Sequence, residues 1–154
     1  FQRLEPTDYV QDFQVNALGA ALAVKAAQKA LKKSSYGSVV LFSSVAAIQG
    51  FPFHASMGMA KAAVSGLAIS LAAELAPQIR VNAIAPSLVK TPLTENMLSN
   101  KNTSDAIAAL HPLKRLGEPD EIASLAAYLL SPDSGWITGQ VMRVDGGRSS
   151  LAGS

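Results

Sequence analysis

Apolar and small residues recur at helical spacing in three stretches of the chain. The first runs from a predicted N-cap at Thr7 to a stop near Ser34. The second covers Ala55 to Leu75 and ends just before a proline. The third, residues 118–130, opens with a proline in its first turn and acidic residues near the positive end of the helix dipole. The pattern predicts three helices of substantial length.

Short apolar runs separate these helices. Residues 38–43 read Ser-Val-Val-Leu-Phe-Ser, without polar alternation, which is typical of a strand buried on both faces. Residues 79–84 and 140–144 are two further predicted strands. Because helices and strands alternate, we expect right-handed crossovers and a three-stranded parallel sheet of the α/β class.

A long irregular stretch, residues 86–119, interrupts this alternation and is called the lid segment. Two short helices are predicted within it, at residues 94–100 and 104–110. His111 precedes a proline in this segment and is expected to be solvated.

Composition narrows the possible function classes. With 154 residues, 49% hydrophobic and 16% charged, the chain has enough apolar material for one well-packed domain. The 13 Lys and Arg residues are scattered and the formal net charge is +2, so nucleic-acid binding is not predicted. Cysteine is absent, which excludes disulfides and thiolate metal sites, and no metal site is predicted. We expect no membrane span, because no apolar run approaches about 18 residues, and we expect a cytoplasmic location.

Several short strings occur in a specific order along the chain. They are residues 15–19 (Val-Asn-Ala-Leu-Gly), 42–44 (Phe-Ser-Ser), 60–64 (Ala-Lys-Ala-Ala-Val), 79–86 (Ile-Arg-Val-Asn-Ala-Ile-Ala-Pro) with 91–92 (Thr-Pro), 136–140 (Trp-Ile-Thr-Gly-Gln) and 144–147 (Val-Asp-Gly-Gly). Each string alone is weak, but their order and spacing together resemble the short-chain dehydrogenase/reductase family over essentially the whole chain. The resemblance implies the carboxyl-terminal part of a Rossmann-type doubly wound parallel sheet, with residues 1–154 forming a portion of one such domain.

The resemblance also implies an active site. In that family a tyrosine exchanges the proton with a carbonyl or alcohol, and a lysine four residues later lowers the tyrosine pKa and holds the cofactor ribose. A serine orients the substrate oxygen, and an asparagine on an earlier helix completes a proton relay. Matched by position, these roles imply Lys61 for the lysine, Ser44 for the serine and Asn16 for the asparagine.

Met57 occupies the position of the family tyrosine. A thioether has no proton to give at neutral pH, so the ordinary acid/base step cannot run from this position. Met57 could instead be a core residue in a protein that no longer does the chemistry. His54, three positions earlier, is an alternative proton donor or a polar rim residue. Ser43 competes with Ser44 as the serine, since either could cap the loop after the strand.

Cofactor binding is predicted at the lid. The resemblance implies that Lys61 and the stretch comprising Pro86, Ser87, Leu88, Val89 and Thr91 line the nicotinamide of NAD or NADP. The family pattern has Pro-Gly where this chain has Pro86-Ser87. The chain begins at Phe1 without an initiator methionine, and we expect the glycine-rich phosphate loop to lie upstream of it.

The expected function is hydride transfer between NAD(P) and a small carbonyl or alcohol, in an atypical or impaired enzyme because the tyrosine is replaced. The alternative is a non-catalytic relative that binds a dinucleotide or forms oligomers as a regulator or structural subunit. The resemblance implies a homodimer or homotetramer. We also expect the strand at residues 38–43 to need a partner, either an amino-terminal half or another copy of the chain.

Overall fold

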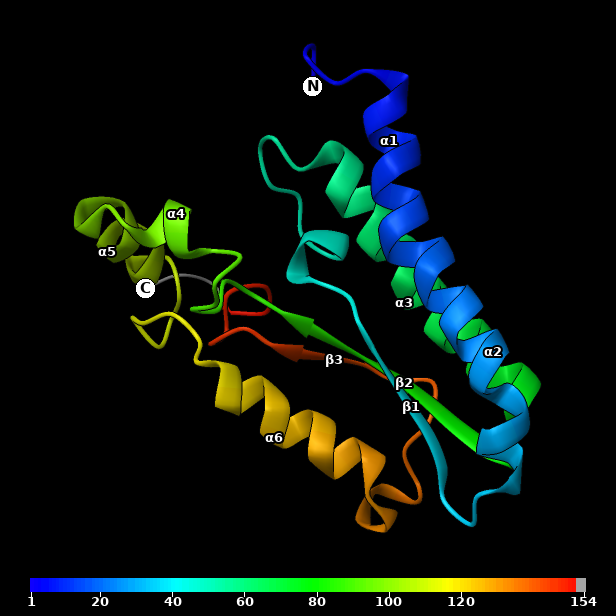
Figure 1. Cartoon of the computed structure of the whole chain (residues 1–154). Helices are drawn as coiled ribbons and strands as arrows, with labels where there is room; N and C mark the ends of the chain where they lie inside the picture. The colour runs from blue at the N-terminus through cyan, green and yellow to red at the C-terminus, as the bar shows by residue number, and fades with distance from the viewer. Residues whose placement is uncertain (152–154) are drawn as a thin grey trace.

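The computed structural model describes residues 1–151 and contains a parallel sheet flanked by helices on both faces (Figure 1). The elements, in chain order, are α1 (Pro6–Phe13), a π-helical segment (Gln14–Leu18), α2 (Gly19–Lys33), β1 (Gly37–Phe42), a 3₁₀ turn (Val45–Ala47), α3 (Ala55–Leu75), β2 (Ile79–Pro86), α4 (Glu95–Leu98), α5 (Lys101–Ala109), α6 (Pro119–Leu130), a second 3₁₀ turn (Pro132–Ser134) and β3 (Val141–Val144).

The sheet has the order β1-β2-β3, and both pairs of neighbours are parallel. Gly37 of β1 lies opposite Ile79 of β2, and Ala83 of β2 lies opposite Val141 of β3. A Cβ atom at residue 37 would lie 2.8 Å from the Leu31 carbonyl oxygen and 2.9 Å from that of Gln78, so only glycine fits where β1 begins. The predicted α/β class and the three parallel strands are confirmed.

The helices form two layers. In Figure 1, α1, α2 and α3 lie on one side of the sheet and α6 lies on the other. The larger core packs α2 and α3 against the sheet and includes Val64, Ala68 and Val81. The smaller core packs α6 against the opposite face through Ile84 and Leu129. This double cover is what the Rossmann-type arrangement requires.

β2 is the central strand, and buried polar groups tie it to the segment that enters β3. The Asn82 side chain is fully buried, donates a hydrogen bond to the Ile137 carbonyl oxygen at 3.0 Å and accepts one from the Gln140 backbone at 3.0 Å. The Thr138 hydroxyl accepts a bond from the Val81 backbone at 3.1 Å. Residues 136–140 therefore form the connection into β3 that provides hydrogen-bond partners for polar groups of β2.

The first predicted helix differs from expectation in two ways. It begins at Pro6 rather than after Thr7, because Glu5 and Asp8 form a capping box. It is also not one regular α-helix, since Gln14–Leu18 is a π-helical segment between α1 and α2. Apolar periodicity could not reveal this insertion, because the residues on either side keep helical spacing.

The predicted strands shift by one or two residues, and β1 is less buried than expected. It runs over Gly37–Phe42, and only Gly37 and Leu41 are buried, while Phe42 is half exposed. Among residues 1–151, β1 lies at an edge of the sheet and pairs only with β2. One side of the strand therefore has no neighbouring strand to cover it.

α3 is more apolar than the sequence argument allowed. It has 21 residues, and its most apolar 18-residue window has a mean hydropathy of 1.3, which by length and composition alone is enough to cross a membrane. Its stripe of Ala60, Val64 and Ala68 is buried against the sheet. In this fold α3 is a core helix.

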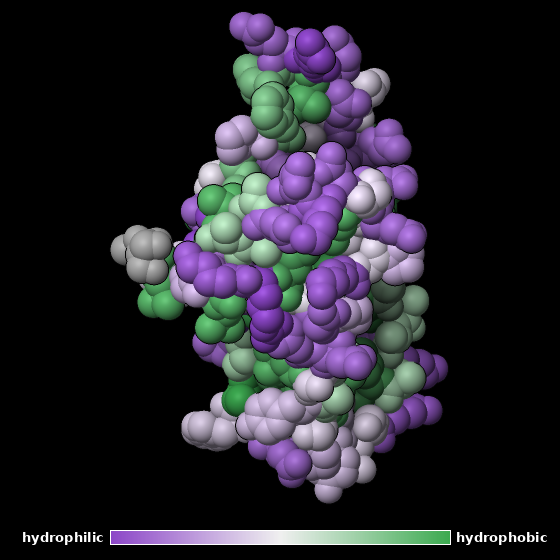
Figure 2. Space-filling view, turned by 90° about the vertical axis from the view of Figure 1, so that its left-hand side faces the viewer, coloured by the Kyte–Doolittle hydropathy of each residue, from purple (hydrophilic) through white to green (hydrophobic). Residues whose placement is uncertain are grey.

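The lid segment carries α4 and α5, both shorter or displaced relative to the predicted helices. Figure 2 shows the molecule from this side, where apolar surface is exposed between hydrophilic segments. The exposed apolar residues of the lid segment are Leu93, Met97, Leu110 and Leu113.

Candidate functional site

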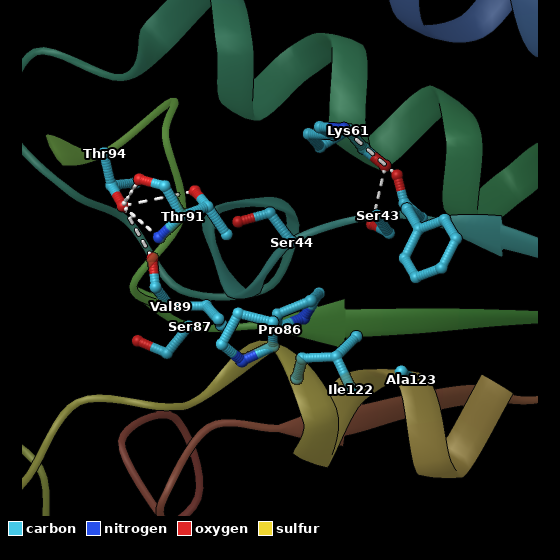
Figure 3. Close-up of a pocket in the computed structure, with 12 residues that line it drawn as sticks. Ser43, Ser44, Lys61, Pro86, Ser87, Val89, Thr91, Thr94, Ile122 and Ala123 are labelled. Atoms are coloured by element: carbon cyan, nitrogen blue, oxygen red, sulfur yellow. Dashed lines mark hydrogen bonds between the residues drawn. The ribbon is translucent and has the colours of Figure 1, made fainter.

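A cavity of about 440 Å³ opens at the carboxyl ends of β1 and β2, which is where parallel sheets place their ligands. It is bounded by α3 on one side and α6 on the other (Figure 3). Its lining residues are Phe42, Ser43, Ser44, Lys61, Pro86, Ser87, Val89, Thr91, Thr94, Pro119, Ile122 and Ala123. The volume is within the usual range for small-molecule sites.

Lys61 enters this cavity from α3. Its Nζ atom donates a hydrogen bond to the Phe42 carbonyl oxygen at 3.1 Å, which anchors the side chain at the end of β1. Burial lowers the pKa of the Lys61 ammonium below its usual value. The group is therefore fixed in place, half-buried, and retains donors that a polar ligand can use.

The two serines after β1 have different surroundings. Ser43 is buried, and its hydroxyl donates to the Lys61 carbonyl oxygen at 2.9 Å and shares a 2.7 Å hydrogen bond with Ser65 Oγ. The Ser44 oxygen accepts a bond from the Ala46 backbone at 3.1 Å, which leaves its proton free to donate. The geometry favours Ser44 as the serine that meets a ligand and gives Ser43 a structural role.

Met57 lies in the first turns of α3, four residues before Lys61, and is partly buried. It is not among the residues that line the cavity beside Lys61. His54 is the N-cap of α3, and its Nδ1 atom lies 2.8 Å from the Pro52 carbonyl oxygen. His54 lines a different cavity, of about 650 Å³, together with Phe51 and Met59, so it does not share the lysine's surroundings.

Asn16 lies in the π-helical segment, and its side-chain amide donates to the Asp12 carbonyl oxygen at 2.9 Å. It does not line the cavity that contains Lys61. A π-helical insertion is often found where a helix presents a functional side chain, and here it falls on the residue matched to the family asparagine.

The loop after β2 contributes most of its predicted residues to the cavity wall. Pro86, Ser87, Val89 and Thr91 line it, whereas Leu88 does not. Five further lining residues were not predicted from the sequence: Phe42 at the end of β1, Thr94 in the lid segment, and Pro119, Ile122 and Ala123 in α6. For the three α6 residues, the sequence signal was the position of that helix after the lid segment, because a crossover helix covers the end of the sheet.

His111 contradicts its predicted solvation. Only 2% of it is exposed, because the lid folds back over the end of β2. Its Nε2 atom lies 2.8 Å from Ser87 Oγ, and its Nδ1 atom lies 3.0 Å from the Ile107 carbonyl oxygen. A carbonyl oxygen can only accept, so Nδ1 carries the proton and Nε2 accepts from the Ser87 hydroxyl.

The turn after β3 lies beside His111 and contains a glycine with a left-handed backbone conformation. At Gly146, which has a φ of +58°, a Cβ atom would meet the His111 side chain at 3.6 Å. Asp145 fixes this turn by accepting hydrogen bonds from the backbone amides of Gly147 and Ser149, each at 2.9 Å. Burial opposes ionisation of Asp145, but these bonds and one from the Ser149 hydroxyl outweigh it and lower its pKa.

A parallel sheet with helices on both faces and a ligand cavity at its carboxyl edge is the Rossmann-type arrangement. Residues 1–149 match the family model described as enoyl-(acyl carrier protein) reductase. The chain belongs to the short-chain dehydrogenase/reductase family.

Named relatives agree with this assignment. A tropinone reductase homolog of Arabidopsis thaliana is 40% identical over 141 residues, which cover 91% of this chain and 53% of the relative. Dehydrogenase/reductase SDR family member 4 of Homo sapiens is 36% identical over 150 residues, covering 96% of this chain and 54% of that protein. The chain thus spans about half the length of these curated relatives.

A solved structure gives the same result. The structure of ElxO with NADP bound superposes with a TM-score of 0.91 at 33% identity, covering 98% of this chain and 62% of that one. The likeness therefore includes both the sheet and the lid, since it extends over almost every residue.

Proposed function

We propose that the protein transfers hydride between NAD(P) and a small carbonyl or alcohol, with the nicotinamide in the cavity that Lys61 lines. The observation that carries this proposal is the position of Lys61, fixed to the end of β1 by the Phe42 carbonyl, in one cavity with Ser44 and the Pro86 to Thr91 loop. ElxO, which matches 98% of this chain, binds NADP. This supports a cofactor of the same class, NAD or NADP, for this protein.

The residues of the cavity fit a nicotinamide and its ribose. Pro86, Val89 and Ile122 provide an apolar wall for a flat ring, and Thr91 offers a hydroxyl for a carboxamide. Lys61 supplies ammonium donors for ribose hydroxyls. When bound, a nicotinamide cofactor supplies or accepts the hydride.

The side chains of the cavity would orient the substrate. The free proton of Ser44 donates to a carbonyl oxygen and polarises it, which makes the carbon more electrophilic. Asn16 would relay protons through water from the π-helical segment, as its match to the family asparagine implies. Ser87 and Leu88 complete the predicted cofactor loop. Met57 stands at the tyrosine position and supplies no proton, so the enzyme is expected to be atypical or impaired.

Measurements of cofactor binding and of cofactor oxidation by the natural protein test the proposal. Titration with NADPH and NADH should quench or shift cofactor fluorescence, and oxidation of the cofactor should follow addition of tropinone, a 3-oxoacyl thioester, a 2-enoyl thioester or a cyclic ketone. A protein that binds neither cofactor would refute the proposal.

Met57 favours a second candidate, a relative that binds the dinucleotide but catalyses nothing and acts as a regulator or structural subunit. The same titrations separate the two functions, because this candidate predicts cofactor binding without turnover of any carbonyl in the panel.

Association with further chain segments belongs to the same proposal. Val15 of the π-helical segment, Leu22 of α2 and Ile69 of α3 are exposed apolar residues, and they favour a homodimer or homotetramer. The edge of β1 would pair with an amino-terminal half or with another copy. Sedimentation as a monomer at micromolar concentration would count against the oligomer. A cytoplasmic location stays a prediction.

A further inference from the structure

Hydride transfer to a carbonyl leaves an oxygen that must take a proton, and the position that supplies it in the family pattern is occupied by Met57. Ser44 and Lys61 can donate hydrogen bonds, but neither is backed by a base that would take a proton in the reverse reaction. Among residues 1–151, the only buried imidazole is that of His111, and it contacts a side chain of the same cavity.

Ser87 connects two cavities. It lines the 440 Å³ cavity that contains Ser44 and Lys61, here called the large cavity. It also lines a second cavity of about 110 Å³ together with His111. In Figure 3, Ser87 lies beside Pro86 at the end of the large cavity opposite Lys61. Its hydroxyl donates to His111 and keeps lone pairs that can accept a proton arriving from the large cavity.

His111 is oriented for this task. Its Nδ1 proton is held by the Ile107 carbonyl, so the basic Nε2 atom must face Ser87. This is the arrangement by which a third group orients a histidine base behind a hydroxyl in other enzymes. The second cavity, which His111 also lines, is large enough for water.

The charges around His111 come from several elements and largely balance. Arg115 and Glu121 line the second cavity and pair with each other at 2.6 Å, and Asp145 lines it as well. Arg148 donates to the Leu110 carbonyl, and Lys114 donates to that of Ala109. The Asp145 carboxylate is already engaged by Gly147 and Ser149.

We propose that Ser87 and His111 form a proton relay that replaces the missing tyrosine. This proposal rests on the proposed function. In alcohol oxidation the substrate C–H bond breaks and its hydride passes to NAD(P)⁺. The substrate O–H proton moves to Ser87 Oγ while the Ser87 proton moves to His111 Nε2. A ketone, NAD(P)H and an imidazolium would result, and the imidazolium would lose its extra proton to solvent before the next turnover. Carbonyl reduction runs these steps in reverse.

The test compares His111→Gln and Ser87→Ala with the unchanged protein. Glutamine can still accept a hydrogen bond from Ser87 but takes up no proton near neutral pH, so it preserves the packing and removes the base. We expect kcat to fall about 100-fold in both variants, with the Kd for NADPH and the urea midpoint of unfolding unchanged. His54→Gln is the matched control, because His54 is exposed and lines another cavity.

One further readout separates a proton carrier from a structural contact. In a Met57→Tyr background the family proton donor is restored, so His111→Gln should no longer lower kcat. This result would support the relay.

Other outcomes would overturn it. Unchanged kcat in His111→Gln, an equal loss in the Met57→Tyr background, or a loss in His54→Gln would each refute the relay while leaving hydride transfer intact. Binding of NADPH without any turnover would refute the relay together with hydride transfer and favour the non-catalytic candidate. Failure to bind either cofactor would refute the proposed function itself.

Discussion

Two corners of the site lie near the end of β2, one at the cavity that Lys61 lines and one at the smaller cavity that Ser87 connects to it, and they differ in how they relate to the family pattern. The lysine corner, comprising Ser44, Met57 and Lys61, keeps two of the three expected family residues and lacks a proton donor. The histidine corner, comprising Ser87 and His111, departs from the Pro-Gly pattern and holds an oriented imidazole. In our proposal the lysine corner lacks a proton donor, and the histidine corner provides one.

A residue can therefore match a family pattern by position without the site as a whole being able to transfer a proton. Lys61 is fixed by a backbone carbonyl at the end of β1, so its placement follows from the fold. A proton donor needs only a titratable group near the reacting oxygen, and the folded lid can bring one from elsewhere. Substitutions in each corner test whether the two corners differ in this way.

Lys61→Met should have the largest effect. It removes the ammonium from the lysine corner while preserving most of the side-chain volume, so kcat/KM should fall about 100-fold or more, with weaker cofactor binding. Steady-state kinetics and NADPH titration measure this. Lys25→Met on the exposed face of α2 is the control, and equal activities in all three proteins would remove Lys61 from the site.

Met57→Tyr should raise turnover, because it places a phenol four residues before Lys61, on the same helix face. The gain should be smaller than the loss in Lys61→Met and approach about 100-fold, the lower end of what a positioned acid contributes. Initial rates with the carbonyl panel test it. A tyrosine variant no faster than the unchanged protein would show that proton supply does not limit turnover.

Asn82→Ala should destabilise the strand that both corners share. It removes the acceptor of the Gln140 backbone amide and one of the two donors to the Ile137 carbonyl, which keeps its bond from Arg80, so the free energy of unfolding should fall by about 2 kcal/mol. Urea denaturation measures the change against Asn102→Ala, an exposed asparagine in α5. A similar, small loss in both variants would contradict the role given to Asn82.

Arg115→Gln should have the smallest effect and alter only the pH dependence of stability near the histidine corner. Hydrogen bonds from Arg115, then from the Glu118 backbone, lower the pKa of Glu121 from 4.5 to about 2. A lowered carboxyl pKa stabilises the fold above about pH 4.5, and this contribution is lost as the pH falls toward 2. The pair is exposed, so solvent screens it.

Urea midpoints at about pH 5 and pH 3 should therefore differ less in Arg115→Gln than in the unchanged protein. Lys29→Gln, on the exposed face of α2, should keep the original difference. An unchanged pH response in Arg115→Gln would show that the ion pair does not set the Glu121 pKa.

Much of the fold could be predicted from the sequence because it depends on local pattern. Helical spacing located α3 and α6, and β2 and β3 were predicted as short strands within two residues of their bounds. The π-helical segment could not be predicted, since it preserves the apolar spacing on both sides. The partial exposure of β1 depends on which strand lies at the edge, and a single strand's composition does not encode that.

The site was predictable only where a residue's role follows from its place on a strand end or helix face. Lys61, Ser44 and most of the loop after β2 line one cavity for this reason. The burial of His111 depends on how the lid folds over Gly146, across about 35 positions of the chain. A histidine before a proline in an irregular segment gives no local signal of such a contact.

The central claim is that the protein transfers hydride although Met57 supplies no proton, and transfer of an isotopic label tests it most directly. The natural protein would be incubated with NADPH or NADH deuterated at the transferred position and with the carbonyl panel, and the products analysed by mass spectrometry. The account predicts an alcohol that carries deuterium on its carbinol carbon. A protein that binds the cofactor yet gives no deuterated product, with or without Met57→Tyr, would contradict it and establish the non-catalytic alternative.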